Sequence, residues 1–214
     1  MLKDEINYLI FGEIYFRFSD PGARRKAFAI LEAAIVCLDR KGFGGVTLEM
    51  IAREAGITRP LIKHYFADLD DLCGTAVKYI RLRFQKMVVD EVSNQTTEVL
   101  KLVRYIDTCF EWIDKFRSHA NVWLSFLSQC VRKPSLRKLN TTAVETGEER
   151  IVGLLRLGQK NNVFHFKSVE GTAKALQSLL TGALVTYSSE DLRDAKEYKK
   201  AILSHGLQLV GVKE

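Results

Sequence analysis

The chain has 214 residues, of which 47% are hydrophobic and 27% charged, and it carries a formal net charge of +6 at pH 7. This length and apolar content suit one large domain, or a small domain joined to a larger one, and they exclude a chain too polar to fold. The sequence also lacks the roughly 20 consecutive apolar residues of a membrane helix and the basic start of a secretory signal, which predicts a cytoplasmic protein with no membrane partner.

Residues 1–20 form an apolar leader, which we expect to pack on the rest of the chain or on a partner. The first predicted helix covers residues 21–41, because apolar residues recur at helical spacing between Ala27 and Leu38. Gly42 follows where a C-terminal cap would stand. We expect this helix to support the two shorter helices that come next.

Two short helices joined by a tight turn are predicted between Thr47 and Phe66. Thr47 and Thr58 are suitable N-caps, and Pro60 lies in a first turn, where its missing N–H breaks no helical bond. Gly56 provides the positive φ that the sharp reversal needs. The apolar face of the first of these helices consists of Leu48, Ile51, Ala52 and Ala55. This arrangement is a helix-turn-helix, in which the second helix enters a DNA major groove.

The basic excess of the chain is concentrated in this region. Residues 21–66 contain eight Lys or Arg and four Asp or Glu, as expected where DNA phosphates are the counterions. The candidate DNA-binding residues are Lys26, Thr47, Thr58, Arg59, Pro60, Leu61, Lys63, His64 and Tyr65. Arg59 can pair with a guanine or remain solvated or phosphate-bound. The two threonines can contact phosphates or act only as caps.

The remainder of the chain is predicted to be helical. Asp68 can cap a fourth helix, and weaker breaks then divide the sequence into about five more helices. These breaks lie near Ser93, Ser118, Pro134, Asn161-Asn162 and Ser188-Ser189. The predicted fold class is all-α, with about nine helices: a three-helix helix-turn-helix domain over residues 21–67 joined to a larger helical bundle over residues 68–214.

The sequence contains none of the common catalytic or metal-binding patterns. Its four cysteines are far apart, and its histidines show no metal spacing, so we expect no metal and no cofactor. The glycines after residue 41 are not followed by the lysine of a phosphate loop, and no nucleophile elbow occurs. The chain is therefore not expected to be an enzyme. A redox role for one of the cysteines stays open.

Both tryptophans and four further aromatic residues fall between Tyr105 and Phe126. Such density marks the place where a cavity for an apolar ligand would lie, although composition alone favours aromatic side chains that fill a helical core. The candidate ligand-binding residues are Tyr105, Cys109, Trp112, Phe116, Trp123 and Phe126.

Several signals in the first third of the chain together resemble the TetR family of bacterial transcriptional regulators. They are Ile30-Leu31, Ala33-Ala34, Gly42, Thr47, Ile51-Ala52, Ala55-Gly56-Ile57-Thr58, His64-Tyr65-Phe66 and Leu72. The resemblance implies a homodimer on a palindromic operator and a C-terminal body that binds a small effector. We expect the effector to be apolar or amphipathic and to release a repressor from DNA. The chain departs from the family pattern at Pro60, Lys63 and Leu69, so no operator sequence is carried over.

The family and two apolar stripes together predict the dimer interface in the last two helices. The candidate residues are Leu176, Leu180, Ala183, Leu184, Tyr187, Ile202, His205 and Leu209. Two alternatives to the effector-controlled regulator stay open: a constitutive DNA-binding protein without an effector, and a helical protein–protein interaction module.

Overall fold

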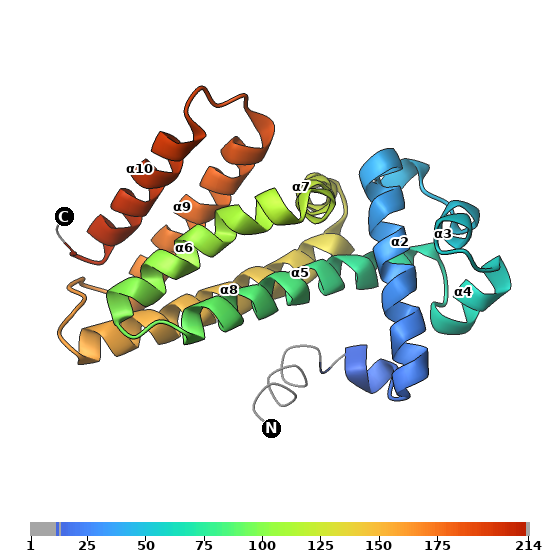
Figure 1. Cartoon of the computed structure of the whole chain (residues 1–214), viewed down its shortest axis with the longest axis horizontal. Coiled ribbons are helices and arrows are strands. Elements are labelled where there is room, and N and C mark those ends of the chain that lie inside the picture. Colours follow the sequence, from blue (N-terminus) through green and yellow to red (C-terminus); the bar gives the residue numbers. More distant parts are fainter. Residues whose placement is uncertain (1–11, 13, 213–214) are drawn as a thin grey trace. The chain divides into compact units, whose positions relative to one another are not determined.

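A computed structural model describes residues 12 and 14–212 (Figure 1). Residues 1–11 and 13, most of the predicted leader, lie outside this description. The secondary structure of the described residues is helical, with no strand among them, which confirms the predicted all-α class. None of these helices has the length and apolar character needed to cross a bilayer.

The chain divides into two compact units. The N-terminal unit comprises Met1–Lys86 and Arg117–Leu136, and the C-terminal unit comprises Met87–Phe116 and Arg137–Glu214. One division between them falls within helix α5 (Leu69–Ser93). The helix-turn-helix region therefore shares its compact unit with part of α5 and with a later helix.

The longest helix of the N-terminal unit is α2 (Pro21–Gly45). Asp20 caps it by accepting a hydrogen bond of 2.6 Å from the backbone N–H of Ala23. Gly42 interrupts the helical backbone with φ 67° and ψ 174°. The predicted end of the first helix near residue 41 is thus confirmed as a break at Gly42.

Helices α3 (Leu48–Glu54), α4 (Arg59–Tyr65) and α7 (Arg117–Arg132) complete this unit. α2 packs on α3 and on α7, and α3 packs on α4. The interior of the unit is filled by apolar side chains from all of these helices and from the start of α5. Among them are Ile30, Leu31, Leu38, Ile51, Ile62, Phe66, Leu72 and Phe126.

The C-terminal unit contains α6 (Glu98–Lys115), most of α8 (Pro134–Lys160), α9 (Val169–Ser189) and α10 (Ala195–Leu209). The predicted breaks near Ser93, Ser118, Pro134, Asn161-Asn162 and Ser188-Ser189 all fall at or close to helix ends. α6, α9 and α10 pack on one another.

Gly206 explains how closely α10 approaches α6. A Cβ atom at this position would lie 2.7 Å from Cδ1 of Ile106, closer than real Cβ contacts come. The missing side chain therefore lets the α10 backbone lie against α6.

Candidate nucleic-acid interface

Local capping and turn chemistry set the geometry of the α3–α4 pair. The Thr47 hydroxyl accepts a hydrogen bond of 3.2 Å from the N–H of Met50, so the predicted cap is confirmed. Gly56 has φ 65°, as predicted for the reversal. The N–H of Ile57 closes the turn by donating to the carbonyl of Ala52 at 2.9 Å.

Thr58 differs from its prediction in one respect. It occupies the N-cap position of α4, but its side chain makes no capping hydrogen bond. Its backbone carbonyl instead accepts from the N–H groups of Leu61 and Ile62 at 3.1 and 3.4 Å. Because Thr58 is exposed, its hydroxyl lies at the surface of the N-terminal end of α4, where the helix dipole favours an anion.

The two sides of α4 differ sharply in exposure. Arg59, Pro60, Lys63 and His64 are exposed. Ile62 is fully buried, and Phe66, which follows the helix, is 1% exposed. Because the apolar side holds α4 to its own unit, the polar side is left to solvent.

The remaining candidate DNA-binding residues also lie at or near the surface. Lys26 on α2 and Thr47 before α3 are exposed, whereas Leu61 and Tyr65 are half-buried. The Tyr65 ring packs edge-on against His64 and at a tilt against Phe18. Tyr65 thus divides its surface between the interior and the solvent.

Arg59 has a partner that the sequence did not indicate. Its guanidinium forms an ion pair of 2.5 Å with Glu49 in the first turn of α3, and both side chains are half exposed, at 50% and 59%. A second pair, Arg40 with Glu54 at 3.0 Å, joins α2 to the last turn of α3. No periodic or spacing signal predicts such pairs, since they form between side chains on separate helices.

The candidate ligand-binding residues are distributed over both compact units. Tyr105, Cys109 and Trp112 are buried on α6, and Phe116 caps the end of that helix. Trp123 and Phe126 lie on α7 in the N-terminal unit. Phe126 is 2% exposed and packs against Phe43, as a core residue does.

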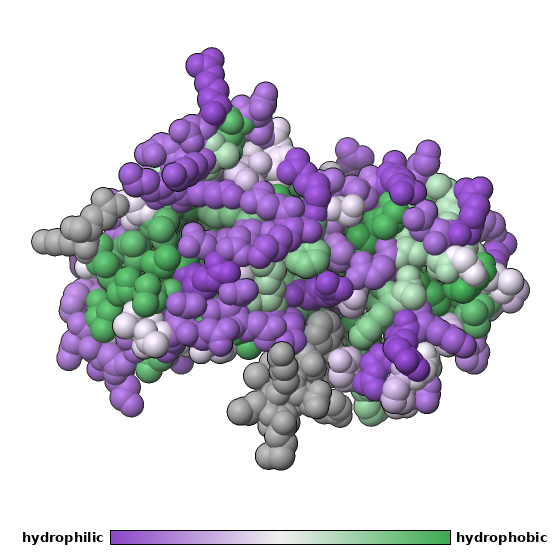
Figure 2. All heavy atoms as spheres, viewed as in Figure 1, coloured by the Kyte–Doolittle hydropathy of each residue, from purple (hydrophilic) through white to green (hydrophobic). Residues whose placement is uncertain are grey.

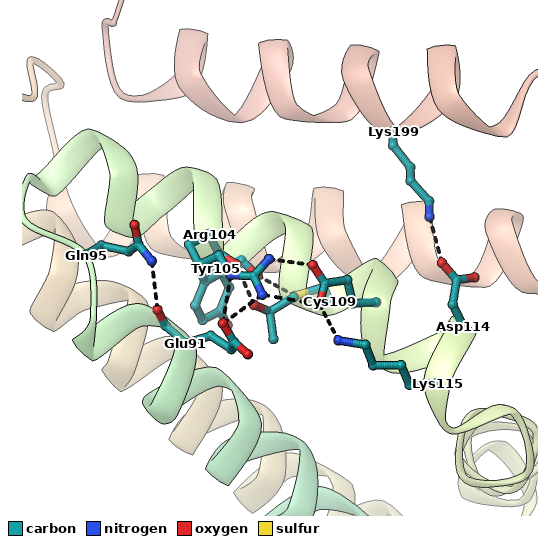
Figure 3. Close-up of polar contacts among 10 residues, drawn as sticks. Glu91, Gln95, Arg104, Tyr105, Cys109, Asp114, Lys115 and Lys199 are labelled. Atoms are coloured by element: carbon teal, nitrogen blue, oxygen red, sulfur yellow. Dashed lines mark hydrogen bonds and ion pairs between the residues drawn. The ribbon is translucent and has the colours of Figure 1, made fainter.

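The polar side of α6 is held by ion pairs (Figure 3). Arg104 forms an ion pair of 2.7 Å with Glu91 on α5. It forms a second ion pair, of 2.5 Å, with Glu111, which lies seven residues later on α6. The hydrogen bond from Arg104 is the largest cause that lowers the pKa of Glu111 to about 2, and a hydrogen bond from Lys115 lowers it further. On the same helix, Asp114 accepts from Lys199 of α10 at 2.8 Å.

Most of the predicted dimer residues are already buried within the subunit. Leu176, Leu180, Ala183 and Leu184 are at most 6% exposed, and Ile202 is 8% exposed, because α9 and α10 pack on each other and on α6. These five side chains therefore belong to the core of the C-terminal unit, which corrects their expected placement at a partner surface. Tyr187 is half-buried, and only His205 and Leu209 of the predicted set are exposed.

All four cysteines are buried thiols that take part in no disulfide. Burial raises the pKa of Cys73 and of Cys109 to about 12. Among the described residues, no group of three or more His, Cys, Asp or Glu side chains is placed to hold a metal ion.

Two known protein families match this chain, one over the helix-turn-helix region and one over the C-terminal helices. Residues 30–74 match the family described as bacterial regulatory proteins, tetR family, and residues 100–209 match the family described as BetI-type transcriptional repressor, C-terminal. The second match alone spans half of the chain. The chain belongs to the TetR family. The members of this family are described as bacterial regulatory proteins.

Curated relatives of this TetR-family chain are described as HTH-type transcriptional regulators. The HTH-type transcriptional regulator BetI of Paraburkholderia xenovorans is 26% identical over 111 residues, 51% of this chain and 57% of the relative. The BetI of Vibrio atlanticus is 23% identical over 155 residues, 72% of this chain and 75% of the relative. The chain thus spans little more than half the length of the first of these relatives.

Solved structures of similar fold cover more of the TetR-family chain. A regulator of Pseudomonas aeruginosa PAO1 has a TM-score of 0.72 and 22% identity, over 91% of this chain and 93% of that one. A regulator of Saccharomonospora viridis, solved in complex with choline, has a TM-score of 0.74 and 22% identity, over 85% and 95% of the two chains. At these identities the likeness establishes the fold.

Proposed function

We propose that the chain is a DNA-binding transcriptional repressor that a small-molecule effector releases from a palindromic operator. The observation that carries this proposal is the exposed side of α4. The second helix of a helix-turn-helix presents Arg59, Lys63 and His64 to solvent, while Ile62 anchors its other side. Exposed side chains of this kind on a recognition helix read base edges and contact phosphates.

The electrostatic part of the proposal is testable without a known operator. Lys63→Ala removes one exposed cation from α4, whereas Lys196→Ala removes one from α10 in the other unit. Against sheared genomic duplex DNA, Lys63→Ala should weaken binding and lower the slope of log affinity against log salt by about one. Lys196→Ala should leave both unchanged. Equal effects of the two variants would favour the protein–protein module over a DNA-binding protein.

A homodimer is part of the proposal, through the outer side of α9. Small side chains recur there at helical spacing and are exposed: Gly171, Ala175, Ser178, Gly182 and Ser189. The larger Val185 is exposed on the same helix. Small residues let two helices approach closely. On α10, His205 and Leu209 are exposed as well. The dimer proposed here therefore uses this outer side rather than the buried leucines of the predicted stripe.

Glycine substitutions separate this interface from the subunit fold. A Cβ atom added at Gly182 on α9, or at Gly153 on α8, meets no atom within 4 Å, so neither position is crowded within the subunit. Gly182→Leu should convert the dimer into monomer in sedimentation equilibrium, and Gly153→Leu should leave it intact. A dimer that persists in Gly182→Leu would place the interface elsewhere.

The effector proposed for the C-terminal unit is a small organic cation of the choline type. The match to BetI-type C-terminal regions and the choline bound to a regulator of the same fold support this class. The chain supplies suitable chemistry, since α6 carries Tyr105, Phe110 and Trp112 and aromatic faces attract organic cations. A polar cation of this class differs from the small apolar or amphipathic effector expected from the sequence.

Two ligands of the same shape test the effector. Calorimetry should detect binding of choline but not of 3,3-dimethylbutan-1-ol, in which a neutral carbon replaces the ammonium nitrogen. Choline should also reduce the affinity of the protein for DNA. Binding of neither compound, together with DNA affinity that choline leaves unchanged, would favour the constitutive DNA-binding protein.

A further inference from the structure

The segment before α2 contributes one arginine to the helix-turn-helix. Residues 14–17 form a helical turn, closed by a bond of 3.0 Å from the N–H of Phe18 to the carbonyl of Ile14. Arg17, at the end of this turn, directs its guanidinium to Asp71 in the first turn of α5. The two nitrogens Nη1 and Nη2 donate to the two carboxylate oxygens at 2.8 and 2.6 Å, a bidentate pair that fixes orientation as well as distance.

The same guanidinium also contacts the end of the recognition helix α4. Nη2 donates to the backbone carbonyl of Tyr65 at 2.9 Å. Tyr65 is the last residue of α4, and the last four carbonyls of a helix have no partner within it. A cation at this end also interacts favourably with the helix dipole. Arg17 therefore satisfies and stabilises the C-terminus of α4.

Asp71 extends the connection to the turn between α4 and α5. Its Oδ2 accepts from the N–H of Ala67 at 2.9 Å, and its own N–H donates to Asp68 at 2.8 Å. Arg17 holds the pKa of the Asp71 carboxyl below its ordinary value, chiefly through the side-chain hydrogen bond. One arginine and one aspartate thus join the leader, the end of α4, the turn and the start of α5.

Aromatic packing surrounds this pair. The Arg17 guanidinium carbon lies 5.3 Å from the centre of the Phe18 ring and 5.1 Å from that of Phe66, within the range of cation–π attraction. The rings of Phe18 and Phe66 meet edge-on at 5.7 Å. Since Phe66 is the residue after α4, the polar and apolar contacts of the leader converge on the same helix end.

We propose that Arg17 is a positioning residue for DNA recognition, which locks the recognition helix α4 to the first turn of α5. The inference rests on the proposed DNA binding for its consequence, although the lock itself is independent of DNA. A seven-residue helix is only marginally stable by itself, so its orientation depends on how its two ends are held. Arg17 holds the end of α4 opposite to Arg59, the residue proposed to pair with a guanine.

The alternative role for an arginine near a reading helix is a direct phosphate contact. Both terminal nitrogens of Arg17 already donate to Asp71, and one also donates to Tyr65. A phosphate contact would require these bonds to break. The two roles differ in salt dependence, because only a direct contact releases a counterion from DNA.

Hydrogen exchange tests the lock on the full chain without DNA. In Arg17→Ala, the amides of residues 61–66 should lose protection by about tenfold, the worth of one charge-assisted bond pair, while residues 30–38 of α2 keep theirs. Arg17→Lys keeps the charge but not the bidentate geometry, and should show a smaller loss confined to the same residues. Arg24→Ala is the matched control, since Arg24 stacks on Tyr15 at 4.1 Å. Unchanged protection of α4 in Arg17→Ala, or equal losses in α2 and α4 in both Arg17 variants, would overturn the proposal.

Binding to sheared genomic DNA then tests the consequence. Arg17→Ala should bind about tenfold more weakly than the wild-type chain, with the same slope of log affinity against log salt. A slope lower by about one would identify Arg17 as a phosphate contact and overturn the positioning role. If the wild-type chain does not bind DNA, the proposed function fails, whereas the exchange result still decides whether Arg17 locks α4 to α5.

Discussion

The ion pair between Arg59 and Glu49 makes a specific prediction about base recognition. Arg59 is the first residue of α4, and Glu49 lies in the first turn of α3. For Arg59 to pair with a guanine, its guanidinium must leave Glu49 or share its donors with it. We therefore expect Glu49→Gln to increase affinity for DNA that Arg59 reads.

The expected size of this gain follows from the exposure of the pair. Both side chains are at least half exposed, and ion pairs of this kind contribute about 0–1 kcal/mol. Releasing Arg59 should therefore improve binding by at most about fivefold, since 1.4 kcal/mol corresponds to tenfold. Arg59→Ala, in contrast, should cost about 1–3 kcal/mol on the preferred sequence if a bidentate guanine contact is lost.

Fluorescence anisotropy on a duplex selected by the wild-type chain, and on its scrambled counterpart, measures both effects. Glu54→Gln is the matched control, because it removes the same charge from α3 but releases Arg40 instead of Arg59. Glu49→Gln should exceed this control on the selected duplex, and the excess should vanish in the Arg59→Ala background. An excess of equal size in that background, or equal losses of Arg59→Ala on both duplexes, would refute the reasoning.

Three further predictions concern stability and reactivity. Gly56→Ala should lower stability by about 1 kcal/mol, measured as a lower Tm, because a Cβ atom at φ 65° is strained although no neighbouring atom crowds it. Arg104 is the main cause that lowers the folded-state pKa of Glu111 from 4.5 to about 2. The ionised Glu111 carboxylate therefore stabilises the fold fully above pH 4.5, and this contribution is lost as the pH falls toward 2. In urea unfolding, the free energy of unfolding that Glu111→Gln loses relative to the wild-type chain should accordingly become smaller between pH 6 and pH 2. The thiols of Cys73 and Cys109, with pKa values raised to about 12 by burial, should resist thiol reagents at pH 8 until the chain is unfolded in denaturant.

Local chemistry explains why the helix-turn-helix was predictable from sequence. A cap at Thr47, a positive φ at Gly56 and a proline in the first turn of α4 each act within a few residues, so their pattern is visible without coordinates. The alternation of buried and exposed positions on α4 follows from the same helical period. The same helical period predicts that Lys63 and His64 lie on the exposed side of α4, where the structure places them.

Long-range placement explains what the sequence could not indicate. The partners Arg17 and Asp71 are 54 residues apart, and no spacing rule connects them. On α9, apolar and small residues occur around most of the helix, so periodicity alone does not distinguish the side that meets α6 and α10 from the outer side. The leucines at 176 and 180 were therefore assigned to a partner, although they fill the subunit core.

Some apolar side chains of the C-terminal unit are not buried within the subunit. Figure 2 shows hydrophobic atoms among the predominantly hydrophilic surface of the described residues, and several large apolar side chains of the C-terminal unit are partly exposed. They are Leu100, Val144, Leu157, Val185 and Leu209, between 36% and 46% exposed. Val185 and Leu209 lie on the two helices of the proposed dimer interface, which gives that surface apolar contact area.

Selection of bound duplexes from a random pool tests the central claim most directly, because it asks whether the exposed side of α4 reads DNA. The expected result is enrichment of a palindrome whose two half-sites lie about one helical turn, or a multiple of it, apart, and its loss when the selection is repeated with Arg59→Ala. A pool that remains random after repeated rounds with the wild-type chain would contradict the claim.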